Sequence, residues 1–199
     1  MRHKGINKEE TRRKMLDAVG QGFREHGYAG IGVDGLAKSA GVTSGAFYSH
    51  FGSKNGAFEV ALVAGLDEVI EGIPKFQSEY ESDWVKAFAE YYLGKPHRRD
   101  LACGCAMATL TSEVVRSGAE LHAEYEKKMT IIAGLVARGL AGGSEEDRLA
   151  RAWSMLGVLI GGINVSRAMK SAKVSEEVAE AIKSAAIKSA GRARSTVKK

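Results

Sequence analysis

The sequence has few cysteines and no long apolar run. Two cysteines occur among 199 residues, in Cys103-Gly-Cys105, too few for a disulfide scaffold and too close together for a long-range bridge. The longest apolar run, residues 155–163, contains three glycines and is much shorter than the roughly 18 residues of a spanning helix. The opening residues lead into charge rather than an apolar signal segment. We therefore expect a cytoplasmic protein without membrane contact.

Metal-ligand pairs and alternating strand patterns are also missing. Cys-x-Cys alone offers two zinc ligands, and no second pair is evident, so we expect no metal and no cofactor. No stretch shows sustained period-two alternation with β-branched residues. Composition is ordinary for a globular protein, with 44% hydrophobic and 27% charged residues. These features favour a soluble all-α chain.

Charge is distributed unevenly along the chain. Residues 1–60 hold nine Lys and Arg against six Asp and Glu, residues 61–182 hold fourteen against eighteen, and the last seventeen hold six against none. A basic front followed by an acidic middle predicts that a polyanion meets the N-terminal part. The basic tail is more simply explained as a solvated terminus.

Apolar spacing predicts about nine helices. The first is expected at about 8–26, with Asn7 and Glu10 as a cap pair and Gly27 as its stop. The others are expected at about 33–40, 43–51, 53–74, 84–95, 103–115 and 117–141, from 144 through at least 163, and from 175 onward. Two short helices on either side of Gly41-Val42 have the form of a helix-turn-helix.

The segment 41–54 is the most informative part of the chain. Small or hydroxyl residues begin its short helix, where a recognition helix presents its first residues to base edges. Tyr48, His50 and Lys54 follow as phosphate donors, and Lys54 lies beside the N-terminus of the next helix, which favours a phosphate. Phe47 and Phe51 are expected in the core. Taken alone, His50 is more simply a structural residue.

Residues from about Thr11 to Leu66 resemble the tetracycline-repressor family of bacterial transcription regulators. The resemblance rests on Thr11-Arg12, Phe23, Gly27-Tyr28, Val33, Leu36-Ala37, Ala40-Gly41-Val42, Phe47-Tyr48, His50-Phe51 and Ser53-Lys54. It implies a homodimeric, all-helical repressor, with a helix-turn-helix DNA-binding domain at 1–52 and a ligand-binding and dimerisation domain at 53–199. It also implies a double-stranded DNA operator and a small-molecule effector as partners. DNA-facing positions would be Thr43, Ser44, Gly45, Ala46 and Ser49 toward bases, with Tyr48, His50, Lys54 and Thr11 toward the backbone.

The chain departs from the family pattern at several positions. Ser44 and Ser49 stand where basic or large residues are common, so arginine-to-guanine readout from this helix is not expected. Gly32 replaces the usual Thr or Ser cap of the second helix. These departures bear on which operator is recognised and how tightly.

The expected domain at 53–199, called the body below, contains candidates for an apolar ligand site and for a dimer interface. Aromatic and Met residues of this kind line small-molecule sites, although each taken singly is more simply a core residue; the ligand candidates are Trp84, Phe88, Tyr92, Met107, Leu110, Tyr125, Met129 and Trp153. The helix expected to begin at Ser144 is apolar nearly all round and must be covered on two sides. Its periodicity fits a monomer core or a subunit interface, and the family resemblance favours the interface, with Trp153, Leu156, Ile160, Ile163, Val178 and Ile182 as its residues.

The two cysteines leave a chemical alternative open. Cys103 and Cys105 lie at the expected start of helix 103–115, after Arg98 and Arg99, and a thiol at such a position has a lowered pKa. The segment 101–110 resembles the Gly-Cys element of a family branch that responds to electrophiles or oxidants, with Ala106 replacing a common proline. Buried packing is the simpler use of free cysteine. Rivals from other classes are a thiol enzyme, which would turn over a peroxide or disulfide, and a sequence-neutral architectural DNA binder.

Overall fold

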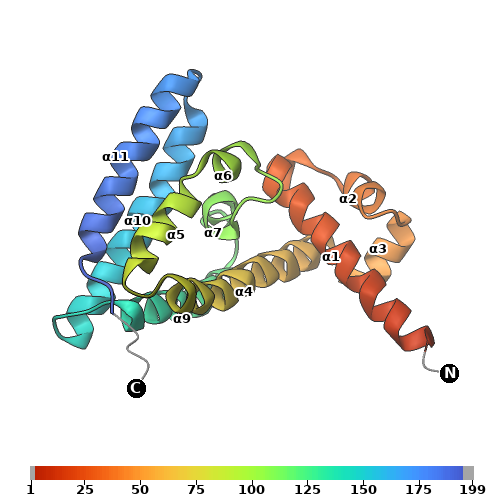
Figure 1. Cartoon of the computed structure of the whole chain (residues 1–199). Helices are drawn as coiled ribbons and strands as arrows, with labels where there is room; N and C mark the ends of the chain where they lie inside the picture. Colours follow the sequence, from red (N-terminus) through yellow and green to blue (C-terminus); the bar gives the residue numbers. More distant parts are fainter. Residues whose placement is uncertain (1–2, 195–199) are drawn as a thin grey trace. The chain divides into compact units, whose positions relative to one another are not determined.

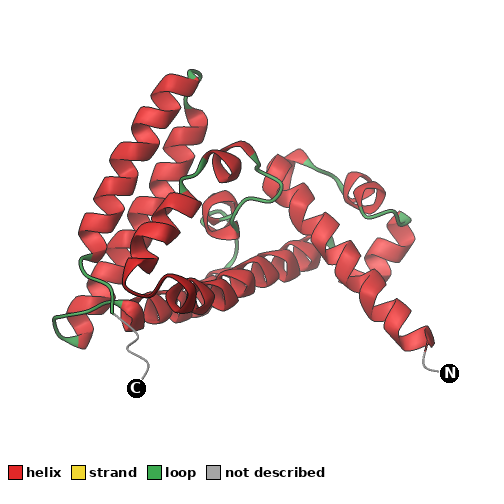
Figure 2. Ribbon diagram, in the orientation of Figure 1, coloured by secondary structure: helices red, strands yellow, loops and turns green. Residues whose placement is uncertain are grey.

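The described part of the chain, residues 3–194 of a computed structural model, is built from helices (Figures 1 and 2). Apart from one isolated bridge between Leu140 and Ala193, it contains no strand pairing. The elements are α1 (His3–Gly30), α2 (Val33–Ser39), α3 (Ser44–Phe51), α4 (Lys54–Tyr80), the 3-10 turn η1 (Glu81–Asp83), α5 (Trp84–Tyr92), α6 (Lys95–Arg99), α7 (Ala106–Thr109), α8 (Thr111–Val114), α9 (Ala119–Gly139), α10 (Glu145–Ala168) and α11 (Ala172–Ala190). The all-α prediction is confirmed.

The chain divides into two compact units. The first comprises Met1–Gly65 and Leu101–Tyr125, and the second comprises Leu66–Asp100 and Glu126–Lys199. This division differs from the boundary expected after residue 52, because residues 54–65 of α4 and segment 101–125 group with the N-terminal helices. Within the first unit, Arg24 Nε donates to the Ala102 carbonyl at 2.7 Å.

The core of the N-terminal helices forms where the sequence pattern places it. Met15, Val19 and Phe23 occupy the buried stripe of α1, and Phe23 packs edge-on against Phe58 of α4 with ring centroids 5.2 Å apart. Regular α1 geometry is interrupted at Gly27, whose φ of 72° lies in the left-handed region that favours glycine. The predicted stop at that residue therefore matches a real break.

The second unit is organised around α10 and α11, which run side by side (Figure 1). Ser144 and Ser171 cap these two helices, with their hydroxyls accepting from the amides of Asp147 and Val174. At Gly162 an added Cβ would lie 2.1 Å from Ile182 Cγ2, so this glycine allows α10 and α11 to approach closely. By length and composition α10 is also apolar enough to cross a membrane, although 39% of its most apolar window is buried inside the protein.

Several expected helix boundaries are wrong. α1 begins at His3, so the cap pair predicted at Asn7 and Glu10 lies inside the helix rather than at its start. α4 continues through exposed Pro74 to Tyr80, although proline removes one backbone hydrogen bond from a helix interior. The single helix expected at 103–115 is two four-residue helices after an irregular turn. α11 starts at Ala172, three residues before the expected start.

Candidate nucleic-acid interface

α2 and α3 form the two helices of a helix-turn-helix. Gly41, with a φ of 68°, lies between them, and the amide of Val42 donates to the Ala37 carbonyl at 2.9 Å. Leu36 of α2 and Phe47 of α3 are fully buried. The turn and these two side chains fix the orientation of α3 against the other helices of residues 3–65, called the head below.

The first turn of α3 is capped and open to solvent. Thr43 is its N-cap, and its hydroxyl accepts from the amide of Ala46 at 3.2 Å. The Ser44 hydroxyl donates to Asp34 Oδ1 of α2 at 2.6 Å, while Thr43 and Gly45 are exposed and Ala46 is half-buried. Polar and small groups therefore cover this end of the helix, and none of them is a cation.

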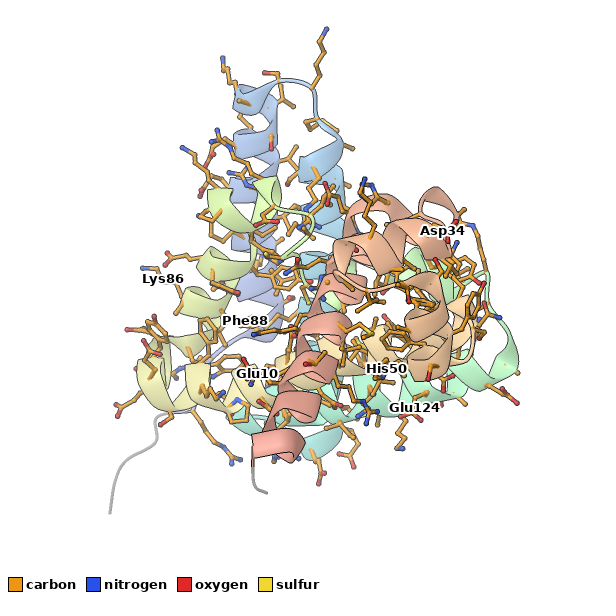
Figure 3. All side chains as sticks on the ribbon, turned by 90° about the vertical axis from the view of Figure 1, so that its right-hand side faces the viewer. Glu10, Asp34, His50, Lys86, Phe88 and Glu124 are labelled. Atoms are coloured by element: carbon orange, nitrogen blue, oxygen red, sulfur yellow. The ribbon has the colours of Figure 1, made fainter. Side chains whose placement is uncertain are left out.

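Further hydrogen-bond donors lie on the rest of α3 and on α1. Tyr48 is 51% exposed, and Ser49 and His50 are exposed on the same helix; Figure 3 labels His50 and Asp34 on the head. Thr11 is exposed on α1. These residues are all available at the surface of the first unit.

Lys54 begins α4 in a defined environment. Its Nζ lies 4.4 Å from the ring centroid of Tyr28, a cation–π geometry. Ser53 caps the helix, accepting from the amide of Gly56 at 3.0 Å, and the Tyr28 hydroxyl donates to Asn55. The ammonium belongs to the first residue of α4, and the N-terminus of a helix favours a phosphate.

The predicted ligand residues fall in both units. Trp84, Phe88, Tyr92 and Met129 are buried in the second unit, where Trp84 Nε1 donates to the Gly139 carbonyl at 3.0 Å. In the first unit Met107 and Leu110 are fully buried. The 680 Å³ pocket of the first unit is lined by other residues, among them Tyr28, Phe58 and Glu113.

Tyr125 and Trp153 complete the ligand candidates. The Tyr125 hydroxyl is 2.7 Å from Thr111 Oγ1, and burial raises the pKa of this phenol. Trp153 was expected at both the ligand site and the interface. Its side chain is 41% exposed on α10, which fits a surface that meets a partner and not the lining of a cavity within one chain.

The residues expected at the dimer interface differ in exposure. Leu156 and Ile163 are 1% and 0% exposed, so a single chain already covers them. Gly157 and Gly161 follow Trp153 at intervals of four residues on α10, and all three are exposed. Ile160 of α10 and two α11 candidates are half-buried; the latter are Val178 and Ile182.

The cysteines do not start a long helix. Cys103 is exposed and lies in the turn before α7, and Cys105 is half-buried at the N-cap position of α7; both are thiols. The guanidinium of Arg98, expected to act on them, binds Glu176 and Ser175 inside the second unit. Within the described residues, no group of three or more His, Cys, Asp or Glu is placed to hold a metal ion.

The geometry of α2, α3 and the start of α4 defines a helix-turn-helix DNA-binding protein. Residues 16–61 match the family model described as bacterial regulatory proteins, tetR family. The chain therefore belongs to the tetR family of DNA-binding transcription regulators.

Two relatives and two solved structures illustrate the likeness. The chain is 26% identical over 145 residues to the HTH-type transcriptional repressor NemR of Escherichia coli K12, covering 70% of this chain and 72% of that protein. It is 31% identical over 98 residues to the repressor AcnR of Corynebacterium glutamicum, covering 43% of this chain and 51% of that protein. The reduced form of E. coli NemR has a TM-score of 0.69 at 19% identity, with 88% and 97% of the two chains covered. A TetR-family regulator from Agrobacterium tumefaciens has a TM-score of 0.72 at 14% identity, with 88% and 97% covered. These relatives are regulators, not enzymes.

Proposed function

We propose that the protein is a homodimeric repressor that binds a pseudo-palindromic operator and is released from it by a small-molecule effector. The observation that carries the proposal is the capped, solvent-open first turn of α3, held by buried Phe47 and followed by Lys54 at the start of α4. This combination supplies base-facing groups and a backbone-facing cation on one surface. The residues predicted to face DNA keep those roles in this proposal.

An unpartnered apolar stripe on α10 supports the dimer. Leu149, Trp153 and Val165 are 36%, 41% and 49% exposed, and an added Cβ at Gly157 or Gly161 would meet nothing within 4 Å. Large apolar side chains next to open glycines allow a second helix to approach closely. A two-fold axis at this stripe would present two recognition helices to two half-sites about 34 Å apart or a multiple of that spacing.

Gly157→Arg tests the dimer because the single chain has room for the new side chain. We expect a folded monomer by sedimentation velocity, with operator binding lost. Gly72→Arg is the matched control, since this helical glycine of α4 also has nothing within 4 Å of an added Cβ and the substitution adds the same charge. A Gly157→Arg protein that stays dimeric and keeps wild-type operator affinity would refute the interface. Ile160→Glu, at the edge of the stripe, should also dissociate the dimer.

In this proposal the effector releases the operator by shifting the protein from a form that binds DNA to a form that does not. A compound that binds the body preferentially in the form unable to bind DNA shifts the protein toward that form. Buried aromatic and Met residues of the second unit, including Trp84, Phe88 and Met129, offer the apolar surroundings that such a compound requires. A true effector must both raise the melting temperature by mass action and lower operator affinity in the same concentration range.

A thiol trigger is the second candidate, and the exposure of Cys103 favours it. Half-buried Cys105 lies two residues away, and an internal bridge between such close thiols would be strained, so a sulfenic acid, an adduct or a bridge to the other subunit is the expected product. The NemR structure that this fold resembles is described as a reduced form. In this version, modification of the thiols would release the operator.

A further inference from the structure

A basic pocket of about 480 Å³ lies in the second unit, outside the DNA-facing and ligand residues discussed so far. It is formed where α6, the end of α10 and the start of α11 meet. Its lining includes six cationic side chains: Lys95, Arg98, Arg99, Arg167, Lys170 and Lys173. Glu176 is the acidic residue of the lining, so the pocket carries a large excess of positive charge.

Arg98 is the buried base of this pocket. It is 9% exposed, and its Nη1 donates to the Ser175 carbonyl at 2.8 Å and to Ser175 Oγ at 3.1 Å. Its Nη2 donates to Glu176 Oε2 at 2.6 Å, whereas its Nε is buried without a hydrogen-bond partner. A buried guanidinium N–H without an acceptor is costly, and it marks a place where an oxyanion would be favourable.

Two of the lysines share a carboxylate or contact one only weakly. Lys95 Nζ is 3.8 Å from Glu176 Oε2, the same oxygen that Arg98 binds, so one carboxylate serves two cations. Lys173 Nζ reaches Glu177 at 4.0 Å across an exposed surface, where such a pair is weak. Arg167 Nη2 donates to the His97 carbonyl at 2.7 Å.

The N-terminus of α11 adds to the positive potential of the pocket. Ala172 and Lys173 place the N-terminus of the 19-residue α11 in the pocket wall, and free amides at a helix N-terminus favour an anion.

We propose that this pocket is a binding site for a small phosphate-bearing molecule. Arginine forks and helix amides are the groups that bind phosphate oxygens most effectively, and the pocket combines both with four lysine and arginine side chains at its exposed rim. The ligand bridges α6, α10 and α11, so it stabilises the second unit. The site lies outside the proposed interface with DNA and outside the buried aromatic candidates.

Inorganic pyrophosphate is the probe for this site. At fixed ionic strength we expect a saturable signal by calorimetry and a rise in melting temperature, with sulfate much weaker. Arg99→Ala/Lys170→Ala removes two exposed cations of the rim and should weaken pyrophosphate binding by about tenfold or more. Lys86→Ala/Lys188→Ala is the matched control, because both lysines are exposed in the second unit and neither lines the pocket.

Three outcomes would overturn the proposal. Equal pyrophosphate affinity of the pocket variant and the control variant would show that the pocket is not the site. Equal binding of sulfate would show an unspecific response to anions. A parallel loss of affinity for non-operator duplex DNA in the pocket variant alone would assign the cations to the DNA backbone instead. Arg98 is left unchanged in this test, because its substitution would also remove the hydrogen bonds that hold Ser175 and Glu176.

Discussion

Lys54→Ala is the substitution that most directly tests the proposed contact with the DNA backbone. Lys54 Nζ sits 4.4 Å from the centroid of the Tyr28 ring at the start of α4, where Ser53 Oγ accepts from the amide of Gly56. Removing the side chain deletes a cation that faces a phosphate and leaves the fold in place. Loss of the cation–π contact costs about 0.5–1 kcal/mol at an exposed site, too little to unfold the head.

The expected size follows from counterion release. Each neutralised phosphate contributes about −0.9 to the slope of log affinity against log salt, so two copies of Lys54 in a dimer contribute about −1.8. The variant should therefore show a shallower slope by about that amount. Between about 50 and 200 mM salt, the wild-type protein should lose about twelvefold more affinity than Lys54→Ala.

Fluorescence anisotropy with a labelled operator duplex, repeated over a salt series, measures the slope directly. Lys54→Arg should keep the wild-type slope because the charge remains, and Lys86→Ala on α5 should also keep it (Figure 3). Parallel slopes for Lys54→Ala and the wild type would refute the phosphate contact. If Lys54→Ala lost affinity for one operator variant only, the phosphate contact would also be refuted, because a contact with the DNA backbone acts on all sequences alike.

Two further predictions concern the cysteines and the buried histidine. An electrophile should release wild-type protein from its operator in a gel-shift assay while Cys103→Ser/Cys105→Ser stays bound; equal responses would make the thiols structural. Because burial lowers the pKa of His97 below its ordinary value near 6.5, the unfolded chain takes up a proton more readily, and the free energy of unfolding should fall as the pH drops through about 6.5. Urea titrations at about pH 7.5 and pH 5.5 should show a smaller difference for His97→Gln, and an unchanged difference would contradict this origin.

The head was predictable because its signals are local. Gly27 and Gly41 both adopt positive φ where the pattern placed a stop and a turn, and Phe47 is buried as its spacing indicated. Each of these features depends on residues within a few positions of it. The break in the helix expected at 103–115, in contrast, does not depend on nearby residues alone. There the Thr111 hydroxyl bonds to the Met107 carbonyl and to Tyr125 of α9, a competition with helical bonding that depends on a distant residue.

The body shows where periodicity alone is insufficient. A seven-residue repeat places Leu156 and Ile163 with Trp153, whereas the structure buries the first two against its own subunit and exposes the third. Distinguishing the two faces requires knowing where α11 lies. The basic pocket was missed for a similar reason, since Arg98 and Glu176 are far apart in the sequence. The available signal was the density of Lys and Arg in segments 95–99 and 167–173.

A recognition helix without Arg or Lys in its first turn must discriminate bases by other means, and the bond between Ser44 and Asp34 indicates one. A serine hydroxyl has one hydrogen to donate and two lone pairs, and the Ser44 hydrogen is directed to Asp34 Oδ1 at 2.6 Å. Toward DNA, Ser44 then acts only as an acceptor, and the major-groove donors are the amino groups of cytosine and adenine. We expect a preference for one of these bases opposite Ser44, worth about 1 kcal/mol or about fivefold in affinity. Asp34→Ala frees the hydroxyl to donate as well, so binding to duplexes that carry each of the four base pairs at that position should show a weaker preference. A wild-type preference for guanine or thymine that disappears in Ser44→Ala would show that the hydroxyl donates to the base instead.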